Sequence, residues 1–246
     1  MADPEVVLYT LGGAFGMRSV SPFCLKIEMA LADLALPYQL VIEPDPRKAP
    51  KGKMPWASIN GQVYADSEII LEGLDELTDG RVYGGLSSQQ RGVGLGLLRL
   101  AEEHLYWLMV AARWLDEAWW PNVKRDFMGV IPMPFRAAVS GLIRRRMRQT
   151  YQYQGLGLHT PEEQQAFAAR DLQALQDAVG SSEFLFGEKP CAYDFGIASI
   201  MAGLYDNVPE TSLTLLANRY TRLKEYAEEV QAHVGVFGRY LGPSET

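Results

Sequence analysis

Four consecutive residues, Ser21-Pro22-Phe23-Cys24, place a hydroxyl and a thiol at the predicted start of a helix. Serine is a favoured N-cap residue, because its oxygen can accept a hydrogen bond from an unpaired backbone N–H, and proline suits the first helical position. The N-terminus of a helix also stabilises negative charge. The Ser21 hydroxyl can therefore cap the helix, stabilise a bound anion, or do both.

The same motif argues against one kind of redox chemistry. Dithiol exchange at a Cys-x-x-Cys sequence needs a nucleophilic thiolate at the first position, and Ser21 occupies that position here. Cys24 lies one helical turn further on, and we expect it to be partly buried and inert. The alternative is that Cys24 itself acts as a nucleophile.

A second polar pair, Asp66-Ser67, precedes an apolar helical pattern that runs to about Leu77. Either residue can cap this helix. The hydroxyl and N–H of Ser67 can equally face an anion at the helix N-terminus. The residue types alone leave both interpretations open.

The elements that must position these residues follow the order β-α-β, loop, β-β-α, which is thioredoxin-like. Apolar residues recur at helical spacing after Pro22, and Pro37 ends that pattern. Asn60-Gly61 joins two β-prone runs and predicts a hairpin. The expected strands cover residues 6–10, 38–42, 57–59 and 62–64.

Helical patterns dominate the chain after residue 87. A Thr-Pro-Glu-Glu sequence at 160–163 is a clear helix start, with a cap, an N1 proline and a glutamate at N3. The expected helices cover about 88–120, 135–153, 160–179 and 192–205, with one or two more within 213–234. We therefore predict an α+β protein with a thioredoxin-like domain (1–78), a linker (79–87) and an all-helical domain (88–246).

Composition narrows the class of protein. The 246 residues carry a net charge of −7, which disfavours non-specific binding to nucleic acid or anionic lipid. The basic run at 144–146 is interpreted as a solvated helix face. Two cysteines give no disulfide framework, and three scattered histidines give no metal-site spacing. No signal peptide or membrane-spanning run is recognised, so we expect a cytoplasmic protein without metal, nucleic acid or membrane anchor.

Taken together, these motifs resemble the glutathione transferase superfamily over nearly the whole chain. Ser21-Pro22-Phe23 is similar to the active-site start of the serine-type classes, Lys53-Met54-Pro55 to the loop before the cis-proline, and Asp66-Ser67 to the acidic-Ser pair. Within the superfamily, Ser-Pro-Phe-Cys-Leu-Lys, residues 50–55 and residues 155–160 resemble the branch of the failed-axon-connections and metaxin-like proteins.

The resemblance implies that glutathione is the co-substrate. It implies that Ser21 donates to the glutathione sulfur, and that the backbone before a cis Pro55 pairs with the cysteinyl part. Asp66-Ser67 would hold the γ-glutamyl end, and Lys53 could reach the glycyl carboxylate. A free thiol has a pKa of about 8.5, and lowering it by roughly two units corresponds to about 2.7 kcal/mol. One hydroxyl donor and a helix N-terminus can supply that stabilisation.

A pocket for a small apolar electrophile is also implied. The glycine-rich loop 11–20, with Phe15 and Met17, would form one wall of this pocket. The other wall would be lined by Tyr106, Trp107 and Trp114. Core packing is an alternative role for these three aromatic residues. The resemblance also implies a homodimer.

Two further features concern helix packing. Gly92, Gly94 and Gly96 have no preceding strand, which favours close helix packing over nucleotide binding, and this packing could lie across a dimer interface. Cys191 stands where the family usually has a Ser or Thr cap, and Asp194 can still bond backward to it.

Two other functions remain open. The chain could be a non-catalytic adaptor with a transferase-like fold, as metaxin-like relatives suggest. It could also be a Cys24-dependent glutathione reductase-type thiol transferase.

Overall fold

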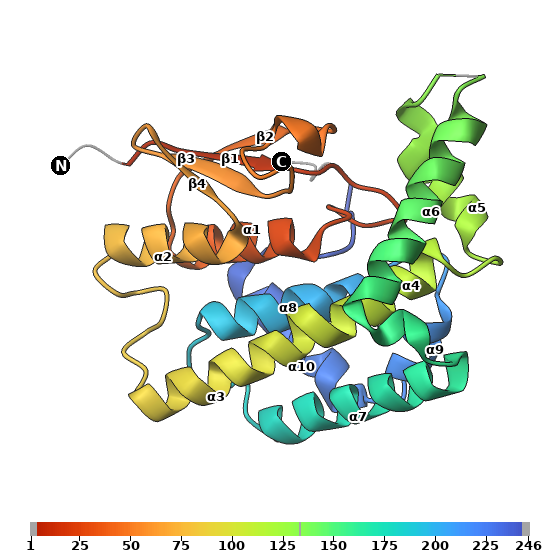
Figure 1. Cartoon of the computed structure of the whole chain (residues 1–246). Coiled ribbons are helices and arrows are strands. Elements are labelled where there is room, and N and C mark those ends of the chain that lie inside the picture. Colours follow the sequence, from red (N-terminus) through yellow and green to blue (C-terminus); the bar gives the residue numbers. More distant parts are fainter. Residues whose placement is uncertain (1–3, 133, 243–246) are drawn as a thin grey trace.

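The structure is a computed structural model that describes residues 4–132 and 134–242. Figure 1 shows a sheet with two helices beneath it, which rest on a larger helical part. The elements of the first part are β1 (Val6–Thr10), α1 (Pro22–Asp33), β2 (Gln39–Ile42), a 3₁₀ turn η1 (Pro46–Lys48), β3 (Trp56–Ile59), β4 (Gln62–Ala65) and α2 (Ser67–Leu77).

The four strands form one mixed sheet in the order β2-β1-β3-β4. β1 runs parallel to β2 and antiparallel to β3, which pairs antiparallel with β4. α1 and α2 cover one face of this sheet (Figure 1), and alternate residues of β1 and β3 are buried there. This is the thioredoxin-like arrangement, and the prediction of its element order is confirmed.

The second part is helical throughout. Its elements are α3 (Ser88–Arg99), a π-helical turn η2 (Leu100–Leu105), α4 (Tyr106–Trp114), α5 (Trp120–Asn122), η3 (Val123–Phe127), η4 (Met128–Val130), α6 (Arg136–Gln154), η5 (Leu156–Leu158), α7 (Pro161–Val179), α8 (Ala192–Tyr205), α9 (Ser212–Ala217) and α10 (Thr221–Val234). α3, η2 and α4 form the long helix that the sequence predicts, but it ends at Trp114 and not near Trp120. The Asp116 carboxylate accepts a hydrogen bond from Ala118 N–H at 2.7 Å, in a new turn after that end.

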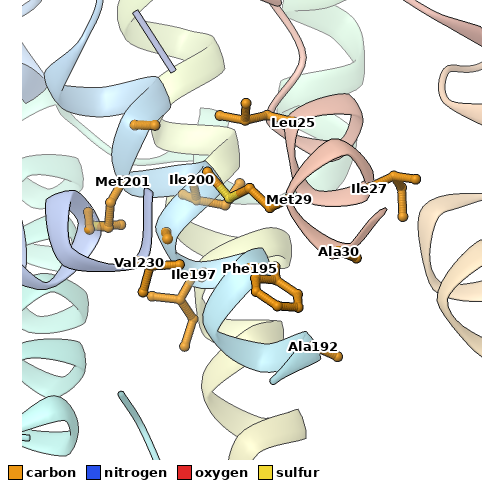
Figure 2. Packing of buried hydrophobic residues seen from close by; sticks show 14 of the residues in the cluster. Leu25, Ile27, Met29, Ala30, Ala192, Phe195, Ile197, Ile200, Met201 and Val230 are labelled. Atoms are coloured by element: carbon orange, nitrogen blue, oxygen red, sulfur yellow. The ribbon is translucent and has the colours of Figure 1, made fainter. Parts of the chain in front are cut away.

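α8 forms the centre of the core, and every residue from Ala192 to Leu204 is buried. Figure 2 shows Leu25 and Met29 of α1 facing Ile197 and Ile200 of α8, with Val230 of α10 on another side. A helix that is apolar all round needs such burial on every side.

The start of α8 is fixed by the carboxylate of Asp194. It accepts hydrogen bonds from Cys191 N–H at 2.9 Å, from Leu185 N–H at 2.8 Å and from the Tyr226 hydroxyl at 2.8 Å. The predicted backward bond from Asp194 to the cap residue is therefore confirmed.

Only one of the three glycines in α3 serves close packing within the chain. A Cβ at Gly94 would overlap the Tyr193 ring of α8, whereas Gly92 and Gly96 have open space at that position.

An ion pair between α1 and η2 is buried where the two parts of the chain meet. Lys26 Nζ lies 2.7 Å from a Glu102 carboxylate oxygen, and the side chains are 0% and 4% exposed. Burial raises the pKa of the Glu102 carboxyl, and the Lys26 ammonium opposes that rise. Since an isolated buried charge is costly, each partner depends on the other.

A half-exposed ion pair, Glu68–Arg99, links α2 to α3 and gives a pH prediction. Arg99 Nη2 lies 2.6 Å from Glu68, and its hydrogen bonds lower the pKa of the Glu68 carboxyl below 4.5. A carboxyl whose pKa is lowered on folding adds stability above its unfolded pKa and loses it as the pH falls through the folded value. We expect Glu68→Gln to lower the free energy of unfolding by about 1 kcal/mol or less at neutral pH. Its effect should be smaller near pH 3, because the stability from this carboxyl is lost as the pH falls through its folded pKa. Urea unfolding at both pH values checks this, and an equal effect at both would contradict it.

Candidate functional site

The sheet register brings the predicted polar residues to one end of the sheet. Tyr9 of β1 pairs with Trp56 of β3, and Trp56 pairs with Ala65 of β4. Pro55 directly precedes this row and Asp66 directly follows it. Because neighbouring strands lie about 4.8 Å apart, the Pro55 and Asp66 backbones approach each other at the end of β1, where the chain leads into the loop before Ser21.

Ser21 occupies the N-cap position of α1, with Pro22 at the first helical position, as the sequence predicts. The expected cap hydrogen bond is not made, because the Ser21 side chain accepts no bond from the first turn. Its backbone instead receives bonds from Cys24 N–H at 3.1 Å and Leu25 N–H at 3.3 Å. The half-buried hydroxyl therefore lies at the positive end of α1 and is not used for capping.

Cys24 is more deeply buried than the sequence suggests, with 0% of its surface exposed. Burial raises the pKa of the Cys24 thiol, while hydrogen bonds involving the Thr10 side chain, the Leu11 backbone and the Ser21 side chain oppose the rise. A thiol that is covered and protonated is a poor nucleophile.

Asp66 is the N-cap of α2, and its backbone has an unusual conformation. Its side chain accepts a hydrogen bond from Glu68 N–H at 3.0 Å, so the capping interpretation of Asp66 is confirmed. Its φ of 108° lies in a region that non-glycine residues rarely adopt. Such strained residues cluster at ligand sites, where the surrounding structure holds them in place.

Ser67 follows as the first residue of α2 and is 6% exposed. Its hydroxyl makes no hydrogen bond within residues 4–132 and 134–242. The Met54–Pro55 peptide bond is cis, as expected, and both of its residues are buried. Lys53 is exposed beside them.

Trp56 is a further residue at this end of the sheet that sequence reasoning missed. Its ring stacks on Tyr9 with centroids 3.6 Å apart and planes 6° from parallel. Its indole Nε1–H is buried and has no acceptor among the described residues. A tryptophan directly after the predicted cis-proline was the available signal.

The loop 11–20 is held tightly. Val208 N–H donates to Phe15 O and Tyr240 N–H to Gly16 O, both at 2.8 Å. Phe15 has a φ of 58°, and its ring packs on the Trp119 ring at 4.8 Å. Phe15 and Met17 are 4% and 2% exposed, so in this conformation they do not form the wall of an open pocket, contrary to the expectation.

The aromatic residues expected on the other wall separate into two groups. Tyr106 is half-buried and meets the ring of Phe23, two residues after Ser21, at 4.9 Å. Trp107 is half-buried beside Tyr106, with ring centroids 5.7 Å apart. Trp114 instead packs against Phe127 at 5.3 Å, in the cluster that contains Phe15.

A buried arginine, Arg113, is a second residue that the sequence did not single out. It is 4% exposed, and it donates to Gly203 O, to Asn207 Oδ1 at 3.1 Å and to the Met17 sulfur at 3.3 Å. Burial lowers the pKa of Arg113 to about 10. Because Gly203 lies near the C-terminus of α8, the negative end of that helix stabilises the cation. Through its contact with Met17, Arg113 therefore helps to hold the loop 11–20 in place.

In residues 4–132 and 134–242, no group of three or more His, Cys, Asp or Glu side chains is arranged to hold a metal ion. No helix in the same ranges is long and apolar enough to cross a membrane.

Comparison with known proteins identifies related sequences. A family model described as "Glutathione S-transferase N-terminal domain" matches residues 22–119. "Failed axon connections" of Drosophila melanogaster is 25% identical over 81% of this chain and 50% of its own length. "Isoprene-epoxide--glutathione S-transferase" of Rhodococcus sp. (strain AD45) is 25% identical over 92% and 98%, and human metaxin-1 is 25% identical over 82% and 45%. The chain thus spans about half the length of two of these relatives.

Solved structures agree on the fold. A rice glutathione S-transferase in complex with glutathione superposes with a TM-score of 0.61 at 17% identity, covering 97% of this chain and 92% of that chain. A glutathione S-transferase of Methylobacterium radiotolerans in complex with glutathione sulfonate gives 0.57 at 18%, covering 98% and 99%. The mixed sheet followed by helices is therefore a glutathione transferase fold. Over residues 22–119 the sequence is similar to the N-terminal domain of glutathione S-transferases.

Proposed function

We propose that this protein is a glutathione transferase, which binds glutathione at the common end of β1, β3 and β4 and stabilises its thiolate for attack on an apolar electrophile. The observation that carries the proposal is the Ser21 hydroxyl, which lies at the N-terminus of α1 without capping it. The same end of the sheet also holds Ser67, whose hydroxyl makes no hydrogen bond in the described part of the chain. Relatives and structural neighbours whose names or titles include glutathione support the same ligand.

In the proposed complex, the N-termini of α1 and α2 bind two different parts of glutathione. Ser21 O–H donates to the glutathione sulfur, and the positive end of α1 adds to the stabilisation of the thiolate. The hydroxyl and N–H of Ser67 donate to the γ-glutamyl carboxylate at the start of α2. Asp66 accepts from the γ-glutamyl ammonium, the Met54 backbone before Pro55 pairs with the cysteinyl unit, and Lys53 pairs with the glycyl carboxylate.

The reaction needs little covalent chemistry from the protein. The thiol proton passes to solvent, the thiolate forms a bond to an electrophilic carbon, and the leaving group or opened ring takes the electron pair. The protein contributes thiolate stabilisation and positioning. Tyr106 and Trp107 form the apolar wall beside the sulfur, while Phe15, Met17 and Trp114 support that wall from within the core.

Burial of Cys24 favours this function over the reductase alternative, because a fully covered thiol cannot attack a mixed disulfide without rearrangement. The adaptor alternative rests on two relatives whose names mention no activity, failed axon connections and metaxin-1. We further propose a cytoplasmic homodimer. Failure to bind glutathione would favour the adaptor.

Ser67→Ala is expected to weaken glutathione binding by roughly 10- to 100-fold, because a hydrogen bond to a charged group contributes about 1.5–3 kcal/mol. Calorimetric titration of glutathione into both proteins measures the change. Ser88→Ala is the matched control, since Ser88 is the first residue of α3 and is exposed. An unchanged affinity in Ser67→Ala would remove this residue from the site.

A further inference from the structure

An outward-facing line of apolar and basic residues on α6 has no role in the proposed reaction. Phe135, Leu142 and Tyr153 are 66%, 68% and 90% exposed, and Val139 is 36% exposed. Large apolar side chains usually avoid such exposure when they lie together. We name this surface the α6 stripe, and it consists of Phe135, Val139, Leu142, Arg145, Arg146 and Tyr153.

Helical geometry aligns four of these residues, and Val139 and Arg145 flank them on opposite sides. At about 100° per residue, Phe135, Leu142, Arg146 and Tyr153 fall within about 20° of one line along the helix. Ser140 and Tyr151, which are 2% and 3% exposed, lie on the opposite side and face the protein. Figure 1 shows α6 along the edge of the molecule, with its N-terminal end extending beyond the other helices. The α6 stripe therefore faces outward, and residues 4–132 and 134–242 do not cover it.

The charge around the α6 stripe is opposite to that of the rest of the protein. Residues 127–160 contain five arginines and no lysine, aspartate or glutamate. Removing these five positive charges from the net charge of −7 leaves −12 for the remainder of the chain. Arg145 and Arg146 are exposed, and neither forms an ion pair within residues 4–132 and 134–242. This charge separation would orient the protein with α6 toward a negatively charged surface.

We propose that the α6 stripe docks on the surface of an anionic phospholipid bilayer, with Phe135, Val139 and Leu142 entering the boundary between headgroups and acyl chains. Helices that bind in the plane of a membrane combine an apolar face with flanking basic residues and aromatic side chains. The arginines would bind lipid phosphates, and Tyr153 would lie at the headgroup level. This is a surface contact, distinct from a membrane-spanning anchor.

A second copy of the chain is a less suitable occupant. Arg145 and Arg146 lie at the middle of α6, so antiparallel packing of two α6 helices through this face would bring four arginines together. Like charges at such an interface oppose association. A bilayer with negative headgroups supplies both the opposite charge and the apolar layer.

The test is co-sedimentation of the full-length chain with vesicles. We expect binding to phosphatidylcholine vesicles that contain roughly one-third phosphatidylserine, and little binding to pure phosphatidylcholine. Arg145→Gln with Arg146→Gln should weaken binding by roughly 25-fold, about fivefold per arginine, and Leu142→Ala should weaken it as well. Raising the salt from about 0.1 M to about 1 M shortens the Debye length from about 10 Å to about 3 Å and should release the protein.

Matched variants keep the test specific. Lys51→Gln with Arg219→Gln removes the same two charges from exposed positions elsewhere, and Ile42→Ala truncates an aliphatic residue on β2 that is 62% exposed. Both should bind like the unaltered protein. The proposal is overturned if anionic vesicles do not bind, if the control variants lose binding equally, or if light scattering shows self-association that Leu142→Ala abolishes. That last result would make the α6 stripe an interface between copies.

Discussion

Ser21→Ala is expected to lower kcat/KM for glutathione conjugation by up to roughly 25-fold at pH 7. With a bound thiol pKa of about 6.5, about three-quarters of the glutathione is thiolate, whereas a pKa of about 8.5 leaves about 3%. Removing the hydroxyl takes away the donor that the proposal assigns to the sulfur, while the N-terminus of α1 remains. Steady-state rates with an apolar electrophile, measured between pH 6 and pH 10, check the prediction.

The pH dependence distinguishes loss of thiolate from loss of structure. The rate defect of Ser21→Ala should shrink above about pH 8.5, where glutathione ionises without help. A damaged fold would give a defect of similar size at every pH. Cys24→Ala is the companion variant, and we expect it to retain conjugation. Loss of activity in Cys24→Ala alone would favour the reductase alternative.

Glu102→Gln is expected to lower the free energy of unfolding by about 3–5 kcal/mol. Lys26 is 0% exposed, and the substitution leaves its ammonium buried beside a neutral amide. The loss is large because the Lys26 ammonium is already removed from water. Within residues 4–132 and 134–242, no second carboxylate lies within hydrogen-bond distance of this ammonium. Urea unfolding followed by tryptophan fluorescence measures the change.

The double variant Lys26→Met with Glu102→Leu is the control for this prediction. Replacing both charges with apolar groups of similar size removes the uncompensated ion, so much of the lost stability should return. The difference between the double variant and the single variants Lys26→Met and Glu102→Leu gives the coupling energy. A loss below about 1 kcal/mol in Glu102→Gln would show that water or a neighbouring group compensates Lys26.

Local signals in the sequence were sufficient to predict the helix starts and the hairpin that position the site. Pro22 at the first helical position, Asn60-Gly61 in the hairpin and Asp66 as a cap each depend on neighbouring residues, and the structure contains all three. The order of strands and helices along the chain was also predicted, and the structure contains it. The predicted glutathione contacts of these residues stay predictions.

Contacts between distant segments could not be predicted in the same way. The expectation of an open wall at Phe15 and Met17 came from their apolar character next to glycines. Their burial depends on Val208 and Tyr240, which hold the loop through backbone hydrogen bonds, and on the packing of Trp119. No periodic pattern near the loop carries that information.

Side-chain orientation was the second limit. The N-cap position of Ser21 was predicted correctly, but whether its hydroxyl turns to the helix depends on the loop conformation. Arg113 looked like one charged residue among many in a helical pattern, and only the positions of Gly203 and Asn207 explain why it is buried. Trp56 gained its significance from its register opposite Tyr9.

In the proposed function, this protein binds glutathione as a thiolate that Ser21 stabilises. The most direct test is ultraviolet titration of the bound thiol, which follows thiolate absorption against pH in the unaltered protein and in Ser21→Ala. We expect an apparent pKa near 6.5 for bound glutathione in the unaltered protein and a value approaching that of a free thiol, about 8.5, in the variant. Bound glutathione with the same pKa in both proteins, or no bound glutathione at all, would contradict it.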